Sequence, residues 1–144
     1  MGILTKQNIV LNVASVSKFE AIENAGKLLV KNGYVNENYI DGMKARENEV
    51  STFMGNGVAI PHGMNEYKKQ IKKSGIVIFQ YPSGVDFGEG NIAYIVIGIA
   101  GIGDDHMEIL SKIALTVQYE ENVERLRNAT SEEEIIAIIE EGEM

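Results

Sequence analysis

The sequence contains no cysteine, which excludes disulfide bonds, thiolate chemistry and cysteine-ligated zinc. It also lacks a long apolar run, since the longest, residues 92–100, is about half of the roughly 20 residues that a membrane-spanning helix needs. The first residues hold no basic region followed by an apolar stretch, and Lys6 stands where a myristoylation signal has Ser or Thr. We therefore expect a cytoplasmic protein without direct membrane insertion, because the missing cysteines also suit a reducing compartment.

Positive charge is scarce as well. Thirteen Lys and Arg residues stand against 21 Asp and Glu residues, and the formal net charge is −8. Much of the acidic excess lies in residues 120–124 and 132–143, which we interpret as solvated faces of helices. A chain of this charge repels long polyanions, so nucleic acid is not an expected partner. A basic protein, or a phosphate group in a local cationic pocket, is compatible with it.

The length and the apolar pattern predict one α/β domain over residues 1–144. With 144 residues, of which 44% are hydrophobic, the chain can bury a core that folds without metal or crosslinks. No repeat, linker or low-complexity segment interrupts it. Helical periodicity alternates with apolar runs typical of strands, which favours a layered sheet with helices on both faces. The period alone leaves the strand order open.

The expected elements follow from caps and apolar runs. Helices are predicted from a capping box at Ser17 and Glu20 to about Asn32, over residues 36–48, over 106–118 after a cap at Asp104 or Asp105, and over 132–140 after a cap at Ser131. Strands are predicted over residues 50–54, 58–60, 75–81 and 92–99, the last two buried on both faces. Residues 81–84, Tyr-Pro-Ser-Gly, are predicted to form a turn that starts a hairpin-like excursion before the strand at residue 92.

A glycine-rich segment, GNGVAIPHGM at residues 55–64, contains His62. Gly55, Gly57 and Gly63 permit backbone conformations closed to other residues and close approach by a partner. Pro61 fixes its own φ and biases the residue before it toward extended geometry, so His62 is held in place. A held imidazole titrates near neutrality and can carry a phosphoryl group covalently, although an inert loop histidine fits these features equally well.

The second histidine, His106, follows the segment GIGDD at the start of a predicted helix. Backbone N–H groups and the helix dipole favour an anion such as phosphate at this position, and an exposed histidine without a task is the alternative. A dinucleotide-binding GxGxxG interpretation fails because His106 stands where the third glycine belongs. Arg46, near the end of the second helix, suits either a surface ion pair with Glu49 or bidentate binding of a phosphoryl group.

Weaker candidates surround the loop, and each has a structural alternative. Ser51 and Thr52 can bind phosphate, orient His62 or satisfy nearby backbone. Met54 and Met64 can form an adaptable docking surface or fill gaps. Four lysines near the loop are interpreted as a solvated helix face: Lys68, Lys69, Lys72 and Lys73.

Four stretches carry a family resemblance: Arg46 followed by E-N-E, GNGVAIPHG, GIVIFQYPSGVDFG at residues 75–88, and VIGIAGIGDDH at 96–106. Together they resemble the enzyme IIA domain of the mannitol/fructose type of the bacterial sugar phosphotransferase system, over residues 4–139. The QYPSGVDFG stretch is most similar to the mannitol branch. The resemblance implies a mixed sheet of about five strands and a phosphotransferase component that works through a phosphohistidine.

The same resemblance implies roles for single residues and partners. His62 is the implied nucleophile, and Arg46 and His106 stabilise charge during transfer. The implied phosphoryl donor is the small carrier HPr, and the implied acceptor is a cysteine of the enzyme IIB domain of a sugar permease. No cofactor and no metal are implied.

Three alternatives stay open at the level of sequence. A regulatory phosphorelay domain of the same fold would receive phosphate on His62 and signal by binding. A fructose-specific IIA component would carry the same chemistry to another sugar. A metal-dependent hydrolase would use His62, His106 and Asp104 or Asp105, but two histidines without a dense ligand motif argue weakly for it.

Overall fold

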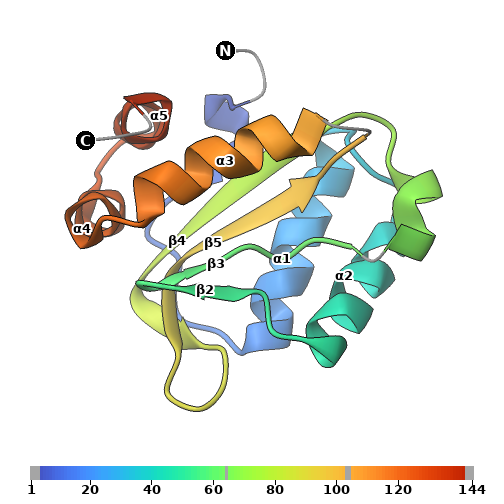
Figure 1. Ribbon diagram of the computed structural model, residues 1–144, viewed down its shortest axis with the longest axis horizontal. Helices are drawn as coiled ribbons and strands as arrows, with labels where there is room; N and C mark the ends of the chain where they lie inside the picture. Colours follow the sequence, from blue (N-terminus) through green and yellow to red (C-terminus); the bar gives the residue numbers. More distant parts are fainter. Residues whose placement is uncertain (1–3, 64, 103–104, 142–144) are drawn as a thin grey trace.

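The computed structural model describes residues 4–63, 65–102 and 105–141, without the side chains of residues 65, 66, 68, 105, 106, 108 and 109. Its centre is a mixed five-stranded sheet with the strand order β1-β4-β5-β3-β2 (Figure 1). The strands are β1 (Ile9–Val10), β2 (Phe53–Gly55), β3 (Val58–Ala59), β4 (Gly75–Asp86) and β5 (Ile92–Ala100). Strands β1 and β3 run parallel to their neighbours β4 and β5, whereas the β4–β5 and β2–β3 pairs are antiparallel. The prediction of a mixed sheet of about five strands is confirmed.

The two long central strands are buried on both faces, as their continuous apolar runs predict. Successive side chains of a strand point to opposite faces. Accordingly Ile76 and Ile78 enter one core cluster, and Val77 and Phe79 enter the other. Each side of the sheet therefore needs its own cover of helices.

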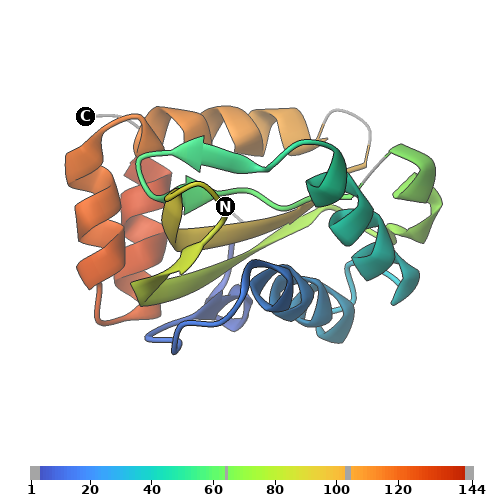
Figure 2. The ribbon, with the colours of Figure 1, turned by 90° about the horizontal axis from the view of Figure 1, so that it is seen from below.

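Helices supply that cover on both faces, as predicted (Figure 2). The helices α1 (Lys18–Lys31) and α2 (Asn38–Glu49) belong to the core cluster that contains Val77. The cluster that contains Ile76 takes residues from α3 (Asp105–Val117), α4 (Glu120–Asn128) and α5 (Glu132–Glu141). Short 3₁₀ helices η1 (Lys6–Asn8) and η2 (Asn65–Gln70) complete the elements. Within the described residues, no helix has the length and apolar character needed to cross a membrane.

The helix ends follow the predicted caps where these are described. The capping box at Ser17 and Glu20 is formed, and α1 ends before Gly33, which has φ +82°. The Ser131 hydroxyl accepts the N–H of Glu134 at 3.1 Å at the start of α5. Asp104, one of the two proposed caps of α3, lies outside the described residues, as does the side chain of Asp105.

The predicted turn at residues 81–84 is wrong. These residues belong to β4, in an irregular stretch where the β4–β5 register shifts between Gln80 and Val85. Pro82 has no N–H to give to the ladder, and Gly84 has φ +85°, so the segment interrupts the regular pairing within the strand. The chain reverses later, where Phe87 N–H donates to the carbonyl of Asn91 at 2.8 Å.

Several short elements were not predicted. Strand β1 has two residues, too few to show a period of two. Helix α4 has nine residues and covers the acidic stretch at 120–124, where Glu120, Glu121 and Glu124 are exposed. The interpretation of this acidic stretch as a solvated helix face is confirmed.

Candidate functional site

The glycine-rich segment begins as the tight hairpin between β2 and β3. Gly55, Asn56 and Gly57 all have positive φ, at +111°, +52° and +82°. Glycine and asparagine tolerate this region of backbone conformation, which explains the Gly-Asn-Gly sequence. The Asn56 side chain donates to the carbonyls of Val117 and Gln118, at 3.1 and 3.3 Å. The hairpin is thereby attached to the C-terminal end of α3.

His62 lies where the chain leaves β3 and still pairs with β5. An isolated parallel bridge joins His62 to Ile99, and the N–H of Ile99 donates to the carbonyl of Pro61 at 3.0 Å. The imidazole is half-buried, and its Nδ1 lies 2.8 Å from the carbonyl oxygen of Ile60. A carbonyl only accepts hydrogen bonds, so this contact assigns the proton of the neutral ring to Nδ1. The ring lone pair then lies on Nε2, the nitrogen suited to attack an electrophile.

Tyr39 of α2 contacts the segment around His62 from the face of the sheet that α1 and α2 cover. Its hydroxyl donates to the carbonyl of Ile99 at 2.8 Å and accepts the N–H of Gly63 at 2.8 Å. Tyr39 is 3% exposed. Burial raises the pKa of its hydroxyl to about 12, and the smaller effect of the Gly63 N–H lowers it. The hydroxyl therefore stays protonated at any physiological pH.

Gly63 is required by this contact. A Cβ at residue 63 would lie 2.5 Å from a ring carbon of Tyr39, which no real side chain tolerates. The close approach expected of the loop glycines thus involves another part of the same chain. Tyr39 was not a candidate from the sequence, because its partners are 24 and 60 residues away in the chain.

A second brace comes from Glu47, also on α2. Its carboxylate is 4% exposed and accepts the hydroxyl of Thr52 at 2.6 Å and the N–H of Thr52 at 3.0 Å. The carbonyl of Thr52 in turn accepts the N–H of Ile60 at 3.0 Å. A hydrogen-bonded path therefore runs from Glu47 through Thr52 and Ile60 to the ring of His62.

This path decides among the alternatives for Thr52. No pattern in the sequence pointed to it. The Thr52 hydroxyl is directed to Glu47, which favours orientation of the loop over direct phosphate binding. Ser51 accepts the N–H of Phe53 at 3.2 Å, as a residue that satisfies local backbone does. Glu47 was not a candidate from the sequence, since a Glu five residues before a Thr is not a distinctive pattern.

Arg46 lies beside Glu47 in the last turn of α2. Its Nη1 donates to the carbonyl of Val50 at 2.5 Å, and the N–H of Val50 donates back to the carbonyl of Arg46 at 3.3 Å. The described residues hold no ion pair between Arg46 and Glu49, which was the alternative considered from the sequence. Arg46 therefore holds the connection that leads into the hairpin before His62.

His106 belongs to the first turn of α3, and its side chain lies outside the described residues. Its position in the fold still relates it to His62. Strands β3 and β5 are parallel neighbours, so the segments that follow them emerge at the same edge of the sheet. His62 follows β3, and α3 starts after β5 at that edge (Figure 1). The topology thus brings the two histidine segments together.

The remaining candidates have ordinary surface positions. Lys69, Lys72 and Lys73 are exposed, and Lys73 lies 5.0 Å from the centre of the Tyr34 ring. Met54 is 43% exposed on the edge strand β2. Met64 and the side chain of Lys68 lie outside the described residues.

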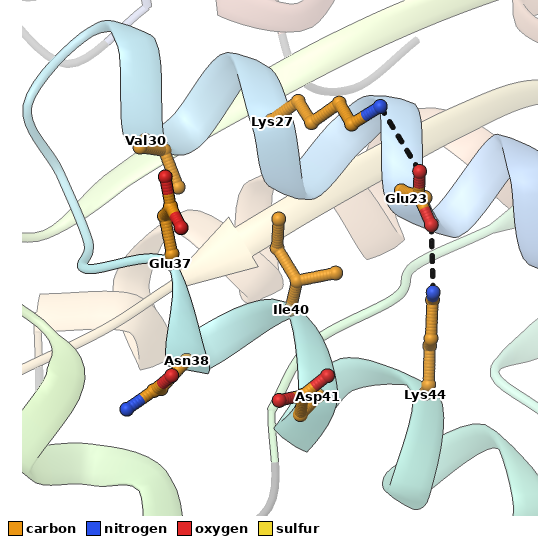
Figure 3. A pocket seen from close by; sticks show the side chains of 8 residues that line it. All are labelled: Glu23, Lys27, Val30, Glu37, Asn38, Ile40, Asp41 and Lys44. Carbon is orange, nitrogen blue, oxygen red and sulfur yellow. Dashed lines mark hydrogen bonds and ion pairs between the residues drawn. The ribbon is translucent and has the colours of Figure 1, made fainter.

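A pocket of about 380 Å³ lies between α1 and α2, lined by eight residues that include none of the loop (Figure 3). Glu23 binds Lys27 and Lys44 there at 3.0 and 2.7 Å. The hydrogen bond from Lys44, followed by the hydrogen bond and charge of Lys27, lowers the pKa of Glu23 to about 2. The pocket thus lies at the packing interface of two helices that these ion pairs join. Nowhere in the described part of the chain do three His, Asp or Glu side chains gather as a metal site would require.

The fold and the loop together define a small α/β domain that presents one imidazole at the edge of a mixed sheet. Residues 2–142 match the family model of the phosphoenolpyruvate-dependent sugar phosphotransferase system, EIIA 2, and the chain belongs to this family. The resemblance inferred from the sequence is confirmed.

Individual relatives match over nearly their whole length. The mannitol-specific phosphotransferase enzyme IIA components of Geobacillus stearothermophilus and Bacillus subtilis are each 54% identical to the chain, over 98% of it and 97% and 99% of their own lengths. A solved complex of enzyme IIA and phosphorylated enzyme IIB for mannitol, from Escherichia coli, contains a chain that is 38% identical. That chain superposes with a TM-score of 0.90, covering 96% of this chain and 97% of its own length.

Proposed function

We propose that this chain is the phosphocarrier of a mannitol phosphotransferase system, with His62 as the residue that carries the phosphoryl group. The observation that carries the proposal is the contact between His62 Nδ1 and the carbonyl of Ile60, at 2.8 Å. Relatives that are named mannitol-specific and share 54% identity support the choice of sugar. The proposal includes the cytoplasm as the place of reaction, because the relay starts from phosphoenolpyruvate.

The donor in this proposal is phospho-HPr. The lone pair on His62 Nε2 attacks phosphorus in line, a bond from Nε2 to phosphorus forms, and the bond from the donor imidazole to phosphorus breaks. The His62 ring gains positive charge as it does so. The Nδ1 proton stays on the ring, where the Ile60 carbonyl stabilises it. The donor ring leaves with its lone pair restored.

The acceptor is a cysteine of an enzyme IIB domain, as the solved complex of a relative with phosphorylated IIB supports. A thiolate attacks phosphorus, the sulfur–phosphorus bond forms, and the bond to Nε2 breaks to return a neutral imidazole. Both steps exchange one labile bond for another, so catalysis consists of positioning and charge stabilisation. We assign the charge stabilisation to Arg46 and His106.

The test is incubation of the purified protein with phosphoenolpyruvate, enzyme I and HPr, followed by phosphopeptide mapping. We expect label on His62 and none in His62→Ala, whose fold survives because a half-buried loop imidazole adds little to the core. His106→Ala serves as the matched control and should still accept label. Label on His106, or undiminished labelling of His62→Ala, would contradict the assignment.

A second measurement separates transport from regulation. Phosphorylated protein is mixed with a mannitol-type IIB domain and, in parallel, with a fructose-type one. Transfer to the mannitol-type IIB at least tenfold faster than to the other supports the proposed function. No transfer to either domain would instead favour the regulatory phosphorelay.

A further inference from the structure

The hydroxyl of Tyr39 occupies a place in the sheet ladder at His62. When two strands pair in parallel, the residue after the bridge donates its N–H to the carbonyl of the bridging partner. For the bridge between His62 and Ile99, these groups are the N–H of Gly63 and the carbonyl of Ile99. Tyr39 Oη accepts from the first at 2.8 Å and donates to the second at 2.8 Å.

On the other side of His62 the ladder is direct. The N–H of Ile99 donates to the carbonyl of Pro61 at 3.0 Å without any intervening group. The chain therefore bonds directly to β5 just before His62 and bonds to it through the hydroxyl of Tyr39 just after it. His62 lies between the direct hydrogen bond to β5 and the pair of hydrogen bonds made by Tyr39.

We infer that Tyr39 is a positioning residue for phosphoryl transfer, which fixes the angle at which His62 leaves the sheet. The inference deepens the proposed function and rests on His62 as the phosphoryl acceptor. The aromatic ring fills the core between α2 and the sheet, whereas the hydroxyl makes both hydrogen bonds to the loop and its partner strand. Removal of the hydroxyl lets Gly63 close onto Ile99 or leaves both groups unpaired, and either change moves the imidazole.

The test variant is Tyr39→Phe, and Tyr81→Phe is its matched control. Tyr81 is also fully buried in the same core cluster, but its hydroxyl makes no hydrogen bond to the loop or to β5 within the described residues. We measure the rate of phosphoryl transfer from phospho-HPr across donor concentrations. Tyr39→Phe is expected to lower the maximal rate about tenfold to a hundredfold, with the half-saturating HPr concentration unchanged. Tyr81→Phe should stay within twofold of the parent.

A spectroscopic readout distinguishes positioning from a general loss of stability. The chain has two histidines, so the ring ¹⁵N signals of His62 can be identified with His106→Gln. In the parent, the signals should report a proton on Nδ1. In Tyr39→Phe, the altered loop should weaken the Nδ1 contact and shift the signals toward the other tautomer, whereas Tyr81→Phe should not.

Two results would overturn the inference. One is a parent-like maximal rate and parent-like ring signals in Tyr39→Phe. The other, measured on the unaltered protein, is exchange of the Gly63 amide at the rate of an open chain, since its bond to Tyr39 should slow exchange by a hundredfold or more. The second measurement decides the question even if Tyr39→Phe does not fold. Absence of label on His62 in the parent would contradict the proposed function itself.

Discussion

At the scale of single residues, the geometry of the site depends on the hydrogen-bond partners of residues 61–63. Of three consecutive residues, Pro61 and Gly63 bond outside the loop through a carbonyl and an N–H, and the ring of His62 bonds to the carbonyl of Ile60. The imidazole is thus presented in one orientation before any partner arrives. A preorganised nucleophile avoids the cost of ordering during transfer.

Substitution of either proposed charge-stabilising residue should slow transfer without abolishing the phosphorylated protein. Loss of one such donor costs roughly a hundredfold in rate, about 3 kcal/mol. Rapid-quench rates for Arg46→Ala and His106→Ala measure this directly. Lys69→Ala removes an exposed cation from the neighbouring η2 helix and is the control. Rates for both variants within twofold of the parent would leave Arg46 and His106 without a catalytic role.

Glu47→Gln should destabilise the protein, because the amide nitrogen of glutamine would face the N–H or hydroxyl that Thr52 now donates. The expected loss in the free energy of unfolding is about 1–3 kcal/mol, measured by urea denaturation. Thr52→Val removes the hydroxyl at the other end of the pair. If the two losses simply add in the double variant, the pair is not coupled and the path to His62 has no energetic basis.

At the scale of elements, α2 organises the site although none of its residues lies in the loop. Tyr39 binds the segment after His62, Glu47 binds Thr52 just before β2, and Arg46 binds Val50 in the connection from α2 to β2. The ion pairs of Glu23 with Lys27 and Lys44 join α1 to α2. The position of α2 on the sheet therefore helps to set the conformation of the loop that carries His62.

The α1–α2 ion pairs should make stability depend on pH in the acid range. The pKa of Glu23 is about 2 in the folded protein against 4.5 for an ordinary glutamate. The stabilisation is therefore complete above about pH 4.5 and is lost as the pH falls toward 2. Glu23→Gln should flatten the decline of the unfolding midpoint over this range, and high salt should weaken the effect since the ion pairs are partly exposed to solvent.

The control for this titration is Glu121→Gln, which alters an exposed carboxylate that makes no ion pair within the described residues. Its midpoints should parallel those of the parent protein from pH 7 to pH 2. An equal flattening in both variants would show that net charge, and not the Glu23 pairs, sets the acid dependence.

At the scale of the whole molecule, exposed apolar side chains occur on the segments that meet at the edge of the sheet near His62. Val50 is 64% exposed before β2, Ile102 is 44% exposed after β5, and Met107 is 54% exposed in the first turn of α3. Met54 instead lies toward the hairpin turn, since β2 runs antiparallel to β3. The segments that carry His62 and His106 emerge at this edge.

A carrier with one active histidine should bind its donor and its acceptor at this one edge in turn. NMR titrations with HPr and with a IIB domain should perturb overlapping sets of signals around residues 50–52, 60–63 and 102–107. Each complex should be transient, with micromolar or weaker affinity. At a net charge of −8, changes of charge at the rim should act mainly on association rates. Separate footprints for the two partners would contradict the proposed relay.

The sequence by itself determined what depends on neighbours along the chain. The capping box at Ser17, the Gly-Asn-Gly hairpin and the buried strands follow from local preferences and from the period of apolar residues. Four stretches, of which the motif around His62 is one, were together enough to identify the family. His62 was also recognisable as a held residue from Pro61 and its glycines alone.

Only the tertiary structure decided which groups hold that histidine. Tyr39 meets Ile99 across 60 residues of sequence, and the strand order that places β3 beside β5 has no local signal. Residues 81–84 likewise stay within β4 because the strand pairs with β5 on both sides of them, at Gln80 and at Val85, which outweighs their turn preference. Local sequence fixes backbone preferences within a few residues, whereas hydrogen bonds between distant segments exist only once packing of the core has brought those segments together.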